Sequence, residues 1–268
     1  MTDVVKKYYE ENVENEWNRL EDPYARIEFF STLYMIKKYF PKSGEIFDIG
    51  SGPGKYSIEL LKRKFKVSLM DISENSILFA KNKIENLELK AEKYICGDAN
   101  YLNGELDNSY HGILLMGPMY HIHYKEKRIN ILKECKRILK PNGVILISYI
   151  NAWGALKAGI SEFPNEFEDI NGIYRLLKEQ NFTKEESFTE AYFTTPPVAL
   201  EEVRISGLKI LNYAGAESFL SGQGMYMTKY YLENKKIYLN LLKVATEKCE
   251  EIQYRDSTEH LLIVAKKQ

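Results

Sequence analysis

Short apolar runs alternate along the chain with longer segments whose apolar positions recur at helical spacing. The first apolar run, Glu45 to Ile49, predicts a buried strand, and a helical pattern follows it from about Lys55. By the same criteria, further strands are predicted at 65–70, 93–96, 110–116, 144–150, 208–213 and 260–265. Strands that alternate with helices in this way predict an α/β fold with a mostly parallel sheet.

We therefore expect a Rossmann-like, doubly wound sheet of seven strands, in which the strongly apolar last strand closes an antiparallel edge. The other segments are predicted to be helical, with two helices at 3–19 and 24–40 before the first strand. Residues 151–192 are rich in acids and aromatics and show no strand pattern, which predicts a helical lid. The predicted organisation is an N-terminal helical cap (1–44), a core (45–150 and 193–268), a lid insertion (151–192) and a further helical insertion (216–250).

Three glycines follow the first predicted strand at alternate positions, Gly50, Gly52 and Gly54. Glycine lacks a Cβ, so it adopts positive φ and lets the backbone approach a ligand closely. A dinucleotide-binding turn has another glycine where Lys55 stands, and a phosphate loop needs glycine at 49 and Ser or Thr at 56, which are absent. The turn therefore suits a ligand without a phosphate there, such as an adenosyl group carrying an amino acid. A glycine-rich loop without a ligand is the alternative.

Acidic residues stand at the ends of the next two predicted strands. Asp71 lies 21 positions after Gly50 (71 − 50 = 21), where a carboxylate can hold both hydroxyls of a ribose, and it can also cap the next helix. Asp98 is placed for the exocyclic amine of an adenine, although a single Asp in a turn is ordinarily a turn residue. The fourth strand runs into Met-Gly-Pro-Met-Tyr-His at 116–121. Because ligands bind beyond the carboxyl ends of such strands, we expect this turn to meet a substrate.

The composition limits the choice of partners and compartment. The chain has 268 residues, a formal net charge of −1 and three cysteines without metal or disulfide spacing. A near-neutral charge gives no bulk field for nucleic acid, and scattered cysteines fit a reducing cytoplasm. The chain shows neither a secretory signal nor an apolar run of the ~20 residues that a membrane helix needs. We therefore expect a cytoplasmic protein with a small-molecule partner, and its oligomeric state is left open.

Four segments together resemble the class I S-adenosylmethionine-dependent methyltransferases. They are Phe-Asp-Ile-Gly-Ser-Gly-Pro-Gly at 47–54, the acid Asp71, Gly-Asp-Ala at 97–99 and Arg-Ile-Leu-Lys-Pro-Asn-Gly-Val at 137–144. The stretches 116–121 and 189–196 resemble a bacterial subgroup that acts on small molecules. The resemblance implies S-adenosyl-L-methionine as cofactor. It also implies methyl transfer to an O, N or S atom of a small molecule by in-line displacement.

The resemblance also implies a role for individual residues. Asp48 and the glycines would shape the site for the methionine part, Asp71 would hold the ribose and Ile72 would pack on the adenine. Asp98 would accept from the adenine amine beside Ala99, and Met116 and Gly117 would lie near the sulfonium. The implied cofactor site consists of Asp48, Gly50, Ser51, Gly52, Tyr56, Asp71, Ile72, Asp98, Ala99, Met116 and Gly117.

Few side chains are predicted to take part in the chemistry itself. His121 is the candidate base, because an imidazole titrates near neutral pH, and a structural hydrogen bond is its alternative role. Tyr120 is a second catalytic candidate, and Tyr9 and Arg19 are candidates for closing the pocket. The Arg19 guanidinium suits the cofactor carboxylate, although packing or a solvated surface is the alternative for each of these residues. His121 and His123 lack a clear third ligand, so no metal is predicted.

Two other functions remain open at this point. A dinucleotide-dependent oxidoreductase is disfavoured by the missing glycine at 55. A non-catalytic protein that binds S-adenosylmethionine is compatible with the sequence, because methyltransferases of this kind have no obligatory catalytic residue.

Overall fold

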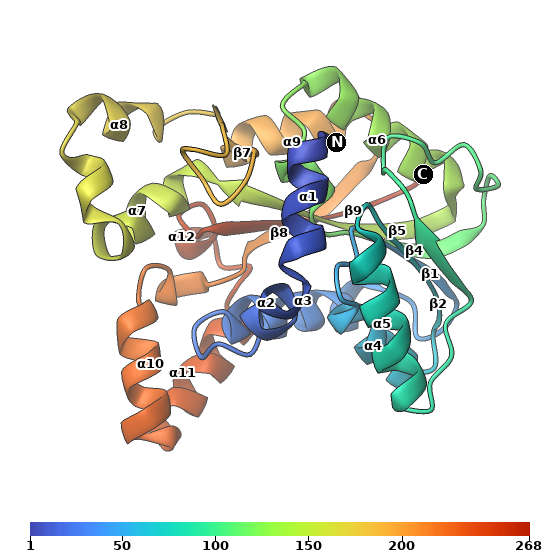
Figure 1. Cartoon of the computed structure of the whole chain (residues 1–268), viewed down its shortest axis with the longest axis horizontal. Coiled ribbons are helices and arrows are strands. Elements are labelled where there is room, and N and C mark those ends of the chain that lie inside the picture. Colours follow the sequence, from blue (N-terminus) through green and yellow to red (C-terminus); the bar gives the residue numbers. More distant parts are fainter.

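The computed structural model describes residues 1–268, except for the side chain of Glu166. It contains one sheet of nine strands flanked by helices (Figure 1). The strands are β1 (Glu45–Ile49), β2 (Lys66–Asp71), β3 (Lys93–Cys96), β4 (Tyr110–Leu115), β5 (Leu139–Asn151), β6 (Gln180–Phe182), β7 (Ala191–Thr194), β8 (Lys209–Gly215) and β9 (His260–Lys266).

Five strands form the parallel centre of the sheet in the order β3-β2-β1-β4-β5. The doubly wound, Rossmann-like and mostly parallel α/β fold is therefore confirmed. β9 is antiparallel, as predicted, but it does not lie at the edge: it pairs with β5 on one side and with β8 on the other. Residues 261–265 are fully buried and apolar because both faces of the sheet are covered here: Leu262 and Val264 pack in one core layer, and Leu261, Ile263 and Ala265 pack in the other.

The segment 151–192 contains two short strands that its sequence did not predict. β6 and β7 form an antiparallel pair, and β7 extends the parallel pairing of β5 at Ile150 and Asn151. The expected count of seven strands is therefore wrong by two. Both strands are only three or four residues long, which is too short for a period of two to stand out from the surrounding acids and aromatics.

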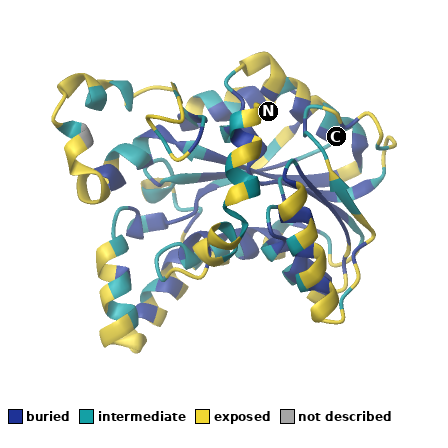
Figure 2. Cartoon of the chain, viewed as in Figure 1, coloured by how far each residue is buried: buried dark blue, intermediate teal, exposed yellow. Residues whose placement is uncertain are grey.

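Helices cover both faces of the sheet. α3, α4 and α5 pack against one face, and α6 and α9 pack against the other, so that the strands between them are the most buried part of the molecule (Figure 2). The predicted helix over 3–19 is two helices, because the chain breaks at Asn12. The α-helices are α1 (Asp3–Glu11), α2 (Val13–Arg19), α3 (Arg26–Tyr39), α4 (Lys55–Lys62), α5 (Glu74–Asn86), α6 (Lys125–Ile138), α7 (Ala152–Glu162), α8 (Ile170–Arg175), α9 (Pro196–Ile205), α10 (Gly224–Glu233), α11 (Lys235–Glu247) and α12 (Ile252–Arg255), with short 3₁₀ turns η1 (Pro118–Tyr120), η2 (Pro164–Phe167) and η3 (Ser218–Leu220).

Three groups of helices lie away from the two main layers. α1 crosses in front of the strands in Figure 1, α7 and α8 form one projecting lobe, and α10 and α11 form another. α10 and α11 pack with α3 in a separate small apolar cluster that includes Ile27, Met227 and Tyr238. Among the described residues, no helix combines the length and the apolar character needed to cross a bilayer.

Candidate functional site

The turn after β1 is fixed by backbone hydrogen bonds to β2. The amide groups of Gly50 and Ser51 both donate to the carbonyl oxygen of Met70, at 2.8 and 3.0 Å. Gly50 has a φ of +75°, and a Cβ there would lie 2.5 Å from Cδ of Pro118. Only glycine fits this position without displacing the turn after β4.

The next glycine faces open space. A Cβ added at Gly52 would meet no heavy atom within 4 Å, and the Gly52 amide donates to Oδ2 of Asp71 at 2.8 Å. The other oxygen of Asp71 accepts from the amide of Ser73 at 2.9 Å, so the carboxylate orders both turns. Burial raises the pKa of Asp71 to about 6 despite these two hydrogen bonds. The cap role and the ligand role predicted for Asp71 are thus compatible in space.

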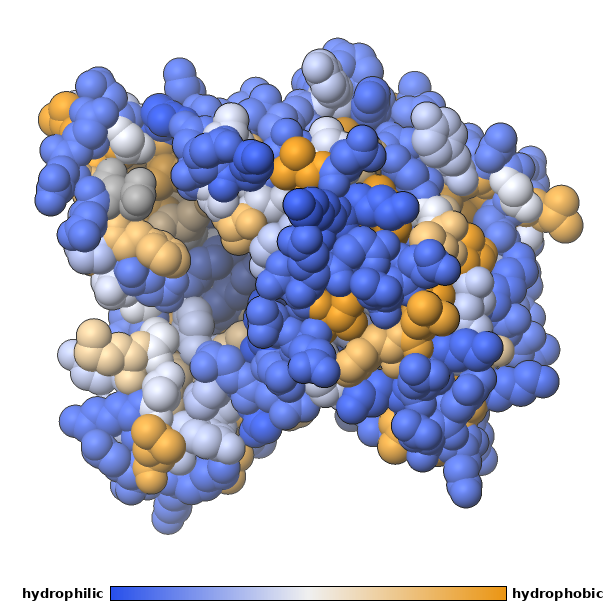
Figure 3. Space-filling model, in the orientation of Figure 1, coloured by the Kyte–Doolittle hydropathy of each residue, from blue (hydrophilic) through white to orange (hydrophobic). Residues whose placement is uncertain are grey.

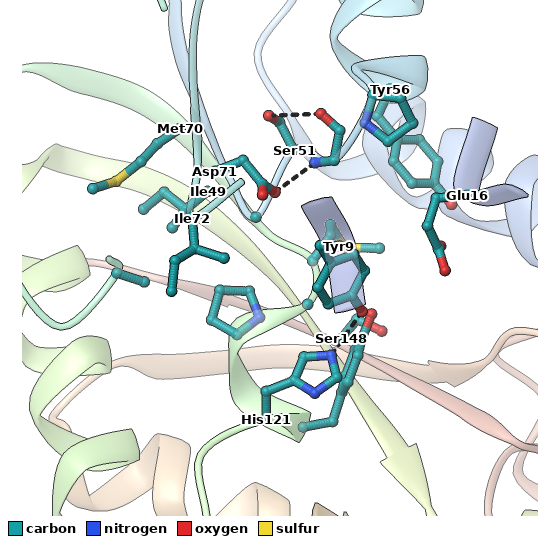
Figure 4. A pocket seen from close by; sticks show the side chains of 18 of the residues that line it. Tyr9, Glu16, Ile49, Ser51, Tyr56, Met70, Asp71, Ile72, His121 and Ser148 are labelled. Atoms are coloured by element: carbon teal, nitrogen blue, oxygen red, sulfur yellow. Dashed lines mark hydrogen bonds between the residues drawn. The ribbon is translucent and has the colours of Figure 1, made fainter. Parts of the chain in front are cut away.

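A pocket opens at this edge of the sheet, beyond the carboxyl ends of β1, β2 and β4 (Figure 4). It encloses about 860 Å³, including the part open to solvent. Thirteen of the predicted site residues line it: Tyr9, Arg19, Gly50, Ser51, Gly52, Tyr56, Asp71, Ile72, Ala99, Met116, Gly117, Tyr120 and His121. The structure therefore brings together residues that are up to 112 positions apart in the sequence (121 − 9 = 112).

Two predicted site residues do not form part of the pocket wall. Asp48 is buried beneath the glycine turn, where Oδ2 accepts from the Ser57 hydroxyl at 2.6 Å and Oδ1 has no partner among the described residues. Burial raises the pKa of Asp48 to about 7. Asp98 accepts hydrogen bonds from the amino group of Met1 and from Asn100, while its neighbours Gly97 and Ala99 line the pocket. The cofactor roles of Asp48 and Asp98 stay predictions.

His121 is held by hydrogen bonds at both ring nitrogens. Nδ1 lies 2.8 Å from the carbonyl oxygen of Glu190, which can only accept, so Nδ1 carries the hydrogen. Nε2 therefore accepts from the Tyr9 hydroxyl, at 2.7 Å. Burial lowers the pKa of His121 to about 4, so the ring is neutral at physiological pH. In this arrangement Nε2 reaches a ligand only through Tyr9 or after Tyr9 has moved, and a base role for His121 stays a prediction.

α1 is fastened to the rim of the pocket on two sides. On one side Tyr9 binds His121, and on the other the Glu10 carboxylate accepts from the backbone amides of Glu74 and Asn75 at 2.8 and 3.0 Å. Those amides are at the start of α5, where the helix dipole favours a negative charge. α1 therefore lies across the rim of the pocket, which Tyr9 lines. In Figure 1 this helix crosses in front of the strands.

Arg19 already has carboxylate partners within the protein. Its Nη1 lies 2.6 Å from Oε2 of Glu28, and its Nε lies 3.4 Å from Oε2 of Glu16. Glu28 is buried in the wall of the same pocket. Burial disfavours its charge, but the charges of Arg19 and His260 and the hydrogen bond from Arg19 together outweigh that effect, and the pKa of Glu28 is lowered. Pairing of Arg19 with a cofactor carboxylate stays a prediction and requires Arg19 to share its charge.

The sequence did not identify several residues of the pocket wall. Glu28 had one available signal, because it is a charged residue beside Ile27 on the apolar stripe of α3. Ser148 likewise interrupts the apolar run of β5. Both signals are weak without the fold, and Glu16 has none. The lining residues that were missed are Met1, Glu16, Leu20, Glu28, Ile49, Pro53, Lys55, Met70, Gly97, Pro118 and Ser148.

A family model described as a methyltransferase domain matches residues 46–143, the stretch that contains β1, β2, β4 and their turns. Residues 46–143 are a methyltransferase domain. The resemblance to class I S-adenosylmethionine-dependent methyltransferases is thereby confirmed for the part of the chain that builds the glycine turn and the Asp71 end of β2.

Relatives of this methyltransferase domain differ in their substrates. A glycine/sarcosine N-methyltransferase of Parasynechococcus marenigrum is 27% identical over 163 residues, which cover 59% of this chain and 56% of that relative. The match thus spans little more than half of the relative's length. A SAM-dependent methyltransferase from Methanosarcina mazei shares the fold with a TM-score of 0.59 and 20% identity, covering 87% of this chain and 96% of its own.

A third similar structure contains ligands. It is a Burkholderia thailandensis 1,6-didemethyltoxoflavin-N1-methyltransferase with bound 1,6-didemethyltoxoflavin and S-adenosylhomocysteine. Its TM-score is 0.61 at 13% identity, with coverage of 99% of this chain and 88% of that one. At this identity the likeness concerns the fold, which places the methyltransferase domain and the segments around it in one shared architecture. Within the described side chains, no group of three or more His, Cys, Asp or Glu is arranged to hold a metal ion.

Proposed function

We propose that the protein is an S-adenosylmethionine-dependent methyltransferase that transfers a methyl group to an O, N or S atom of a small molecule. One observation carries this proposal. The glycine turn, the Asp71 carboxylate and the apolar side chain of Ile72 line one pocket at the strand ends, and Gly52 faces its open space. A small-molecule acceptor is supported by the similar structure from Burkholderia thailandensis, which contains bound 1,6-didemethyltoxoflavin.

The residues of the pocket fit the proposed cofactor. Asp71 presents a carboxylate where a ribose diol can donate to it, and Ile72 and Ala99 offer apolar surface for an adenine. Gly50 and Gly52 leave the backbone bare where the methionine part would lie. The orphaned Oδ1 of Asp48, behind the turn, has capacity for a further donor. Met116 and Gly117 remain for the sulfonium.

When bound, the cofactor supplies a methyl group on a positively charged sulfur, which is already activated for displacement. The protein then needs to align an acceptor atom with the methyl carbon and to exclude water, and such positioning contributes up to about 7–11 kcal/mol in favourable cases. α1 provides the cover, because Tyr9 closes over His121. A protonated acceptor also loses a proton, and the Tyr9–His121 pair and the Glu28 carboxylate are groups of the wall that can assist this loss.

We also infer a cytoplasmic location, because all three cysteines are free in the structure. The non-catalytic binding protein remains the alternative to the enzyme. The dinucleotide-dependent oxidoreductase is less favoured, because the turn after β1 leads into a helix at Lys55 without the glycine of that fingerprint.

Two measurements test the proposal. Isothermal titration calorimetry with S-adenosylmethionine and S-adenosylhomocysteine is expected to show binding to one site. Asp71→Ala is expected to weaken that binding by about 1–3 kcal/mol, because a charge-assisted pair of hydrogen bonds is lost. Asp107→Ala, which removes an exposed carboxylate paired only with Arg137, is the control and should bind normally.

Release of S-adenosylhomocysteine in the presence of small acceptors then separates the two functions. Turnover with any acceptor establishes the enzyme. Binding without turnover across a broad panel of alcohols, amines and thiols favours the non-catalytic alternative, and absence of cofactor binding rejects both.

A further inference from the structure

A second group of buried charges adjoins the pocket on the side away from Asp71. Glu28, in the pocket wall, lies 3.8 Å from Nδ1 of His260. The same nitrogen lies 2.7 Å from Oε1 of Glu217, whose other oxygen accepts from the His260 amide at 3.1 Å. Glu28 and Glu217 are each about 95% buried or more. His260 begins β9, beside the carboxyl end of β5, so this group stands at the same ligand edge of the sheet as the glycine turn.

Carboxylates continue from this group toward the surface. Glu259 accepts from the Tyr24 hydroxyl and, at 2.6 Å, from Ser221, and burial together with the charge of Glu217 raises its pKa to about 7. Glu162, at the end of α7, is exposed, yet partial burial and Glu217 also raise its pKa. We call Glu28, Glu217, Glu259 and Glu162 the acidic row. Figure 3 shows the surface hollowed between the α7–α8 lobe and the α10–α11 lobe, where Glu162 and Gly224 approach one another.

A polar atom that lacks a partner points to a missing ligand in this region. Tyr56 is 93% buried in the pocket wall, and its hydroxyl makes no hydrogen bond within the described residues. The fully buried Thr32 has the nearest hydroxyl, and a hydrogen bond between the two hydroxyls would still leave a lone pair on the phenol oxygen that can accept from a ligand. Glu28 and Tyr56 line the same pocket, and burial together with the charge of Glu28 raises the pKa of Tyr56. In Figure 4 the Tyr56 ring extends toward Glu16. Buried hydroxyls are nearly always bonded, so this one is available to a ligand.

The charges around this region do not balance. Arg19 and His260 are the two cations that contact the carboxylates of this region, whereas Lys55, which also lines the pocket, is paired with Glu21. Each cation is shared between two carboxylates or more. The carboxylates in contact with this cationic pair or with one another are Glu16, Glu28, Glu217 and Glu259. The pKa of Glu259 is raised to about 7, so this carboxylate is partly protonated at neutral pH. Three to four negative charges against two positive charges therefore leave a surplus of one to two, and the proposed cofactor, with one net positive charge, leaves at most one.

We propose that the acceptor is an amine that binds as its ammonium ion between the acidic row and Tyr56, with an apolar or aromatic body toward the rings of Tyr9 and Phe188. This inference rests on the proposed function and specifies its substrate class. Ring faces for the body are near, since Tyr9 and Phe188 pack edge-on against His121. An ammonium satisfies both the surplus charge and the free phenol oxygen, whereas a carboxylate acceptor would add to the surplus.

The bound ammonium has to lose one proton before it reacts. That proton passes to a carboxylate of the acidic row, and the nitrogen lone pair then forms the bond to the methyl carbon. The carbon–sulfur bond breaks with its electron pair remaining on sulfur. The products are S-adenosylhomocysteine and an ammonium that carries one more methyl group, so charge and atoms balance.

Three probes of equal shape test the inference without knowledge of the natural acceptor. They are 2-phenylethylamine, 2-phenylethanol and phenylacetate, each titrated calorimetrically into the protein saturated with S-adenosylhomocysteine. The amine is expected to bind at least about tenfold more tightly than either of the others, the equivalent of one favourable charge interaction. Equal or tighter binding of the alcohol or the acid, or no binding of the amine, overturns the inference. Failure of S-adenosylhomocysteine itself to bind would instead reject the proposed function.

Variants locate the preference on the acidic row. Glu217→Gln keeps the shape of the side chain and is expected to reduce the preference for the amine about fivefold or more. Glu259→Gln, whose amide can still bond Ser221, provides the same test if Glu217→Gln does not fold. Glu250→Gln is the matched control, because Glu250 bonds Lys38, Tyr39 and Asn212 in a separate network. An unchanged preference in both row variants, or an equal loss in the control, contradicts the assignment.

Discussion

The two halves of the sheet edge that carries the pocket are formed by different kinds of chemical groups. The half around β1, β2 and β4 is shaped by backbone: glycine amides, a carbonyl oxygen of Met70 and the sterically confined Gly50. The half around α3, β8 and β9 is shaped by long charged side chains, among them Glu28, Glu217 and His260. Backbone geometry is set by sterics and is insensitive to pH, whereas an ion network responds to protonation and can be altered one side chain at a time.

This difference matches the division of labour that we propose. A cofactor common to many enzymes is met by the backbone half, which the methyltransferase family model covers at residues 46–143. The charged side chains that we assign to the acceptor lie outside that range, in α3, in α7 and beside the C-terminal strands, whereas Tyr56 lies inside it. Acceptors differ between relatives, so we expect the side chains of this half to differ between this chain and its relatives.

The largest effect is expected at the segment that follows the turn after β4, which both halves of the ligand edge share. Arg128 donates to the carbonyl oxygens of Ile122 and His123 at 2.7 and 3.0 Å, and its Nε lies 3.1 Å from the buried Glu202 carboxylate. Glu202→Ala leaves a buried guanidinium without its counter-ion, which is expected to lower the free energy of unfolding by about 3–5 kcal/mol. Urea unfolding measures this loss.

The neighbouring residue supplies the control for that substitution. Glu201 forms an exposed pair with Arg204, so Glu201→Ala should cost less than about 1 kcal/mol. If the two variants are equally stable, the pair of Arg128 and Glu202 does not hold the shared turn.

In the backbone half, Gly50→Ala is expected to have the next largest effect. The new Cβ would meet Pro118 at 2.5 Å and the carbonyl oxygen of Met116 at 3.0 Å, in a residue with φ of +75°. A loss of about 2–3 kcal/mol in the free energy of unfolding is expected, together with loss of S-adenosylhomocysteine binding. Gly104→Ala is the control, because its Cβ meets nothing within 4 Å and its φ is not positive. A stable Gly50→Ala variant that still binds the ligand would show that the turn adapts.

The contribution of the side-chain half to the free energy of unfolding should depend on pH. Burial on its own lowers the pKa of His260, but the charges of Glu28 and Glu217 outweigh it and raise the pKa to about 9, against 6.5 for an unperturbed histidine. Because the raised pKa belongs to the folded state, the stabilisation is complete below pH 6.5 and is lost as the pH rises to about 9. We expect a loss of about 1–3 kcal/mol in the free energy of unfolding across this window.

Urea unfolding at the two ends of the window measures this loss, and two histidine variants assign it. His260→Gln should flatten the dependence, whereas His111→Gln, which alters a half-exposed histidine beside Glu45, should retain it. A decline that survives in His260→Gln would have to arise from other groups, and the ion network would then lose its assigned role.

The smallest effect is expected where the halves meet at Tyr9. Tyr9→Phe leaves Nε2 of His121 without its donor, which should lower the free energy of unfolding by about 1 kcal/mol. Turnover is expected to fall more than the affinity for S-adenosylhomocysteine does. Tyr124→Phe, at a side chain that is 66% exposed, is the control. Unchanged turnover in Tyr9→Phe would leave the pair with His121 a structural contact.

The sequence predicted the backbone half well and the side-chain half poorly, for a physical reason. Gly50, Gly52 and Asp71 stand next to strand ends in the sequence, so local pattern alone places them at one edge of a parallel sheet. Glu28 and His260 are 232 positions apart (260 − 28 = 232), and only the packing of α3 against β9 brings them together. No local signal encodes such a meeting.

The same reasoning accounts for the errors in the fold. β9 was expected at an edge, but it pairs with both β5 and β8. This position depends on where the chain re-enters the sheet and not on the residues of β9 itself. β6 and β7 were missed because three or four residues carry too little periodicity. Asp48 lies within β1 and Asp98 follows β3, and their side chains contact Ser57 and, for Asp98, Met1 and Asn100, so their cofactor roles stay predictions.

The attachment of α1 has a consequence for timing. α1 is held by hydrogen bonds at Glu10 and at Tyr9, so at least one of these contacts has to break whenever a large ligand enters or leaves the pocket. Release of a bound product and binding of the next ligand would then require the same opening of α1. The lifetime of the hydrogen bonds at Glu10 and Tyr9 would therefore limit the rate of ligand exchange. A stronger hydrogen bond at either residue would lower the rate of ligand exchange even if the rate of the chemical step were unchanged.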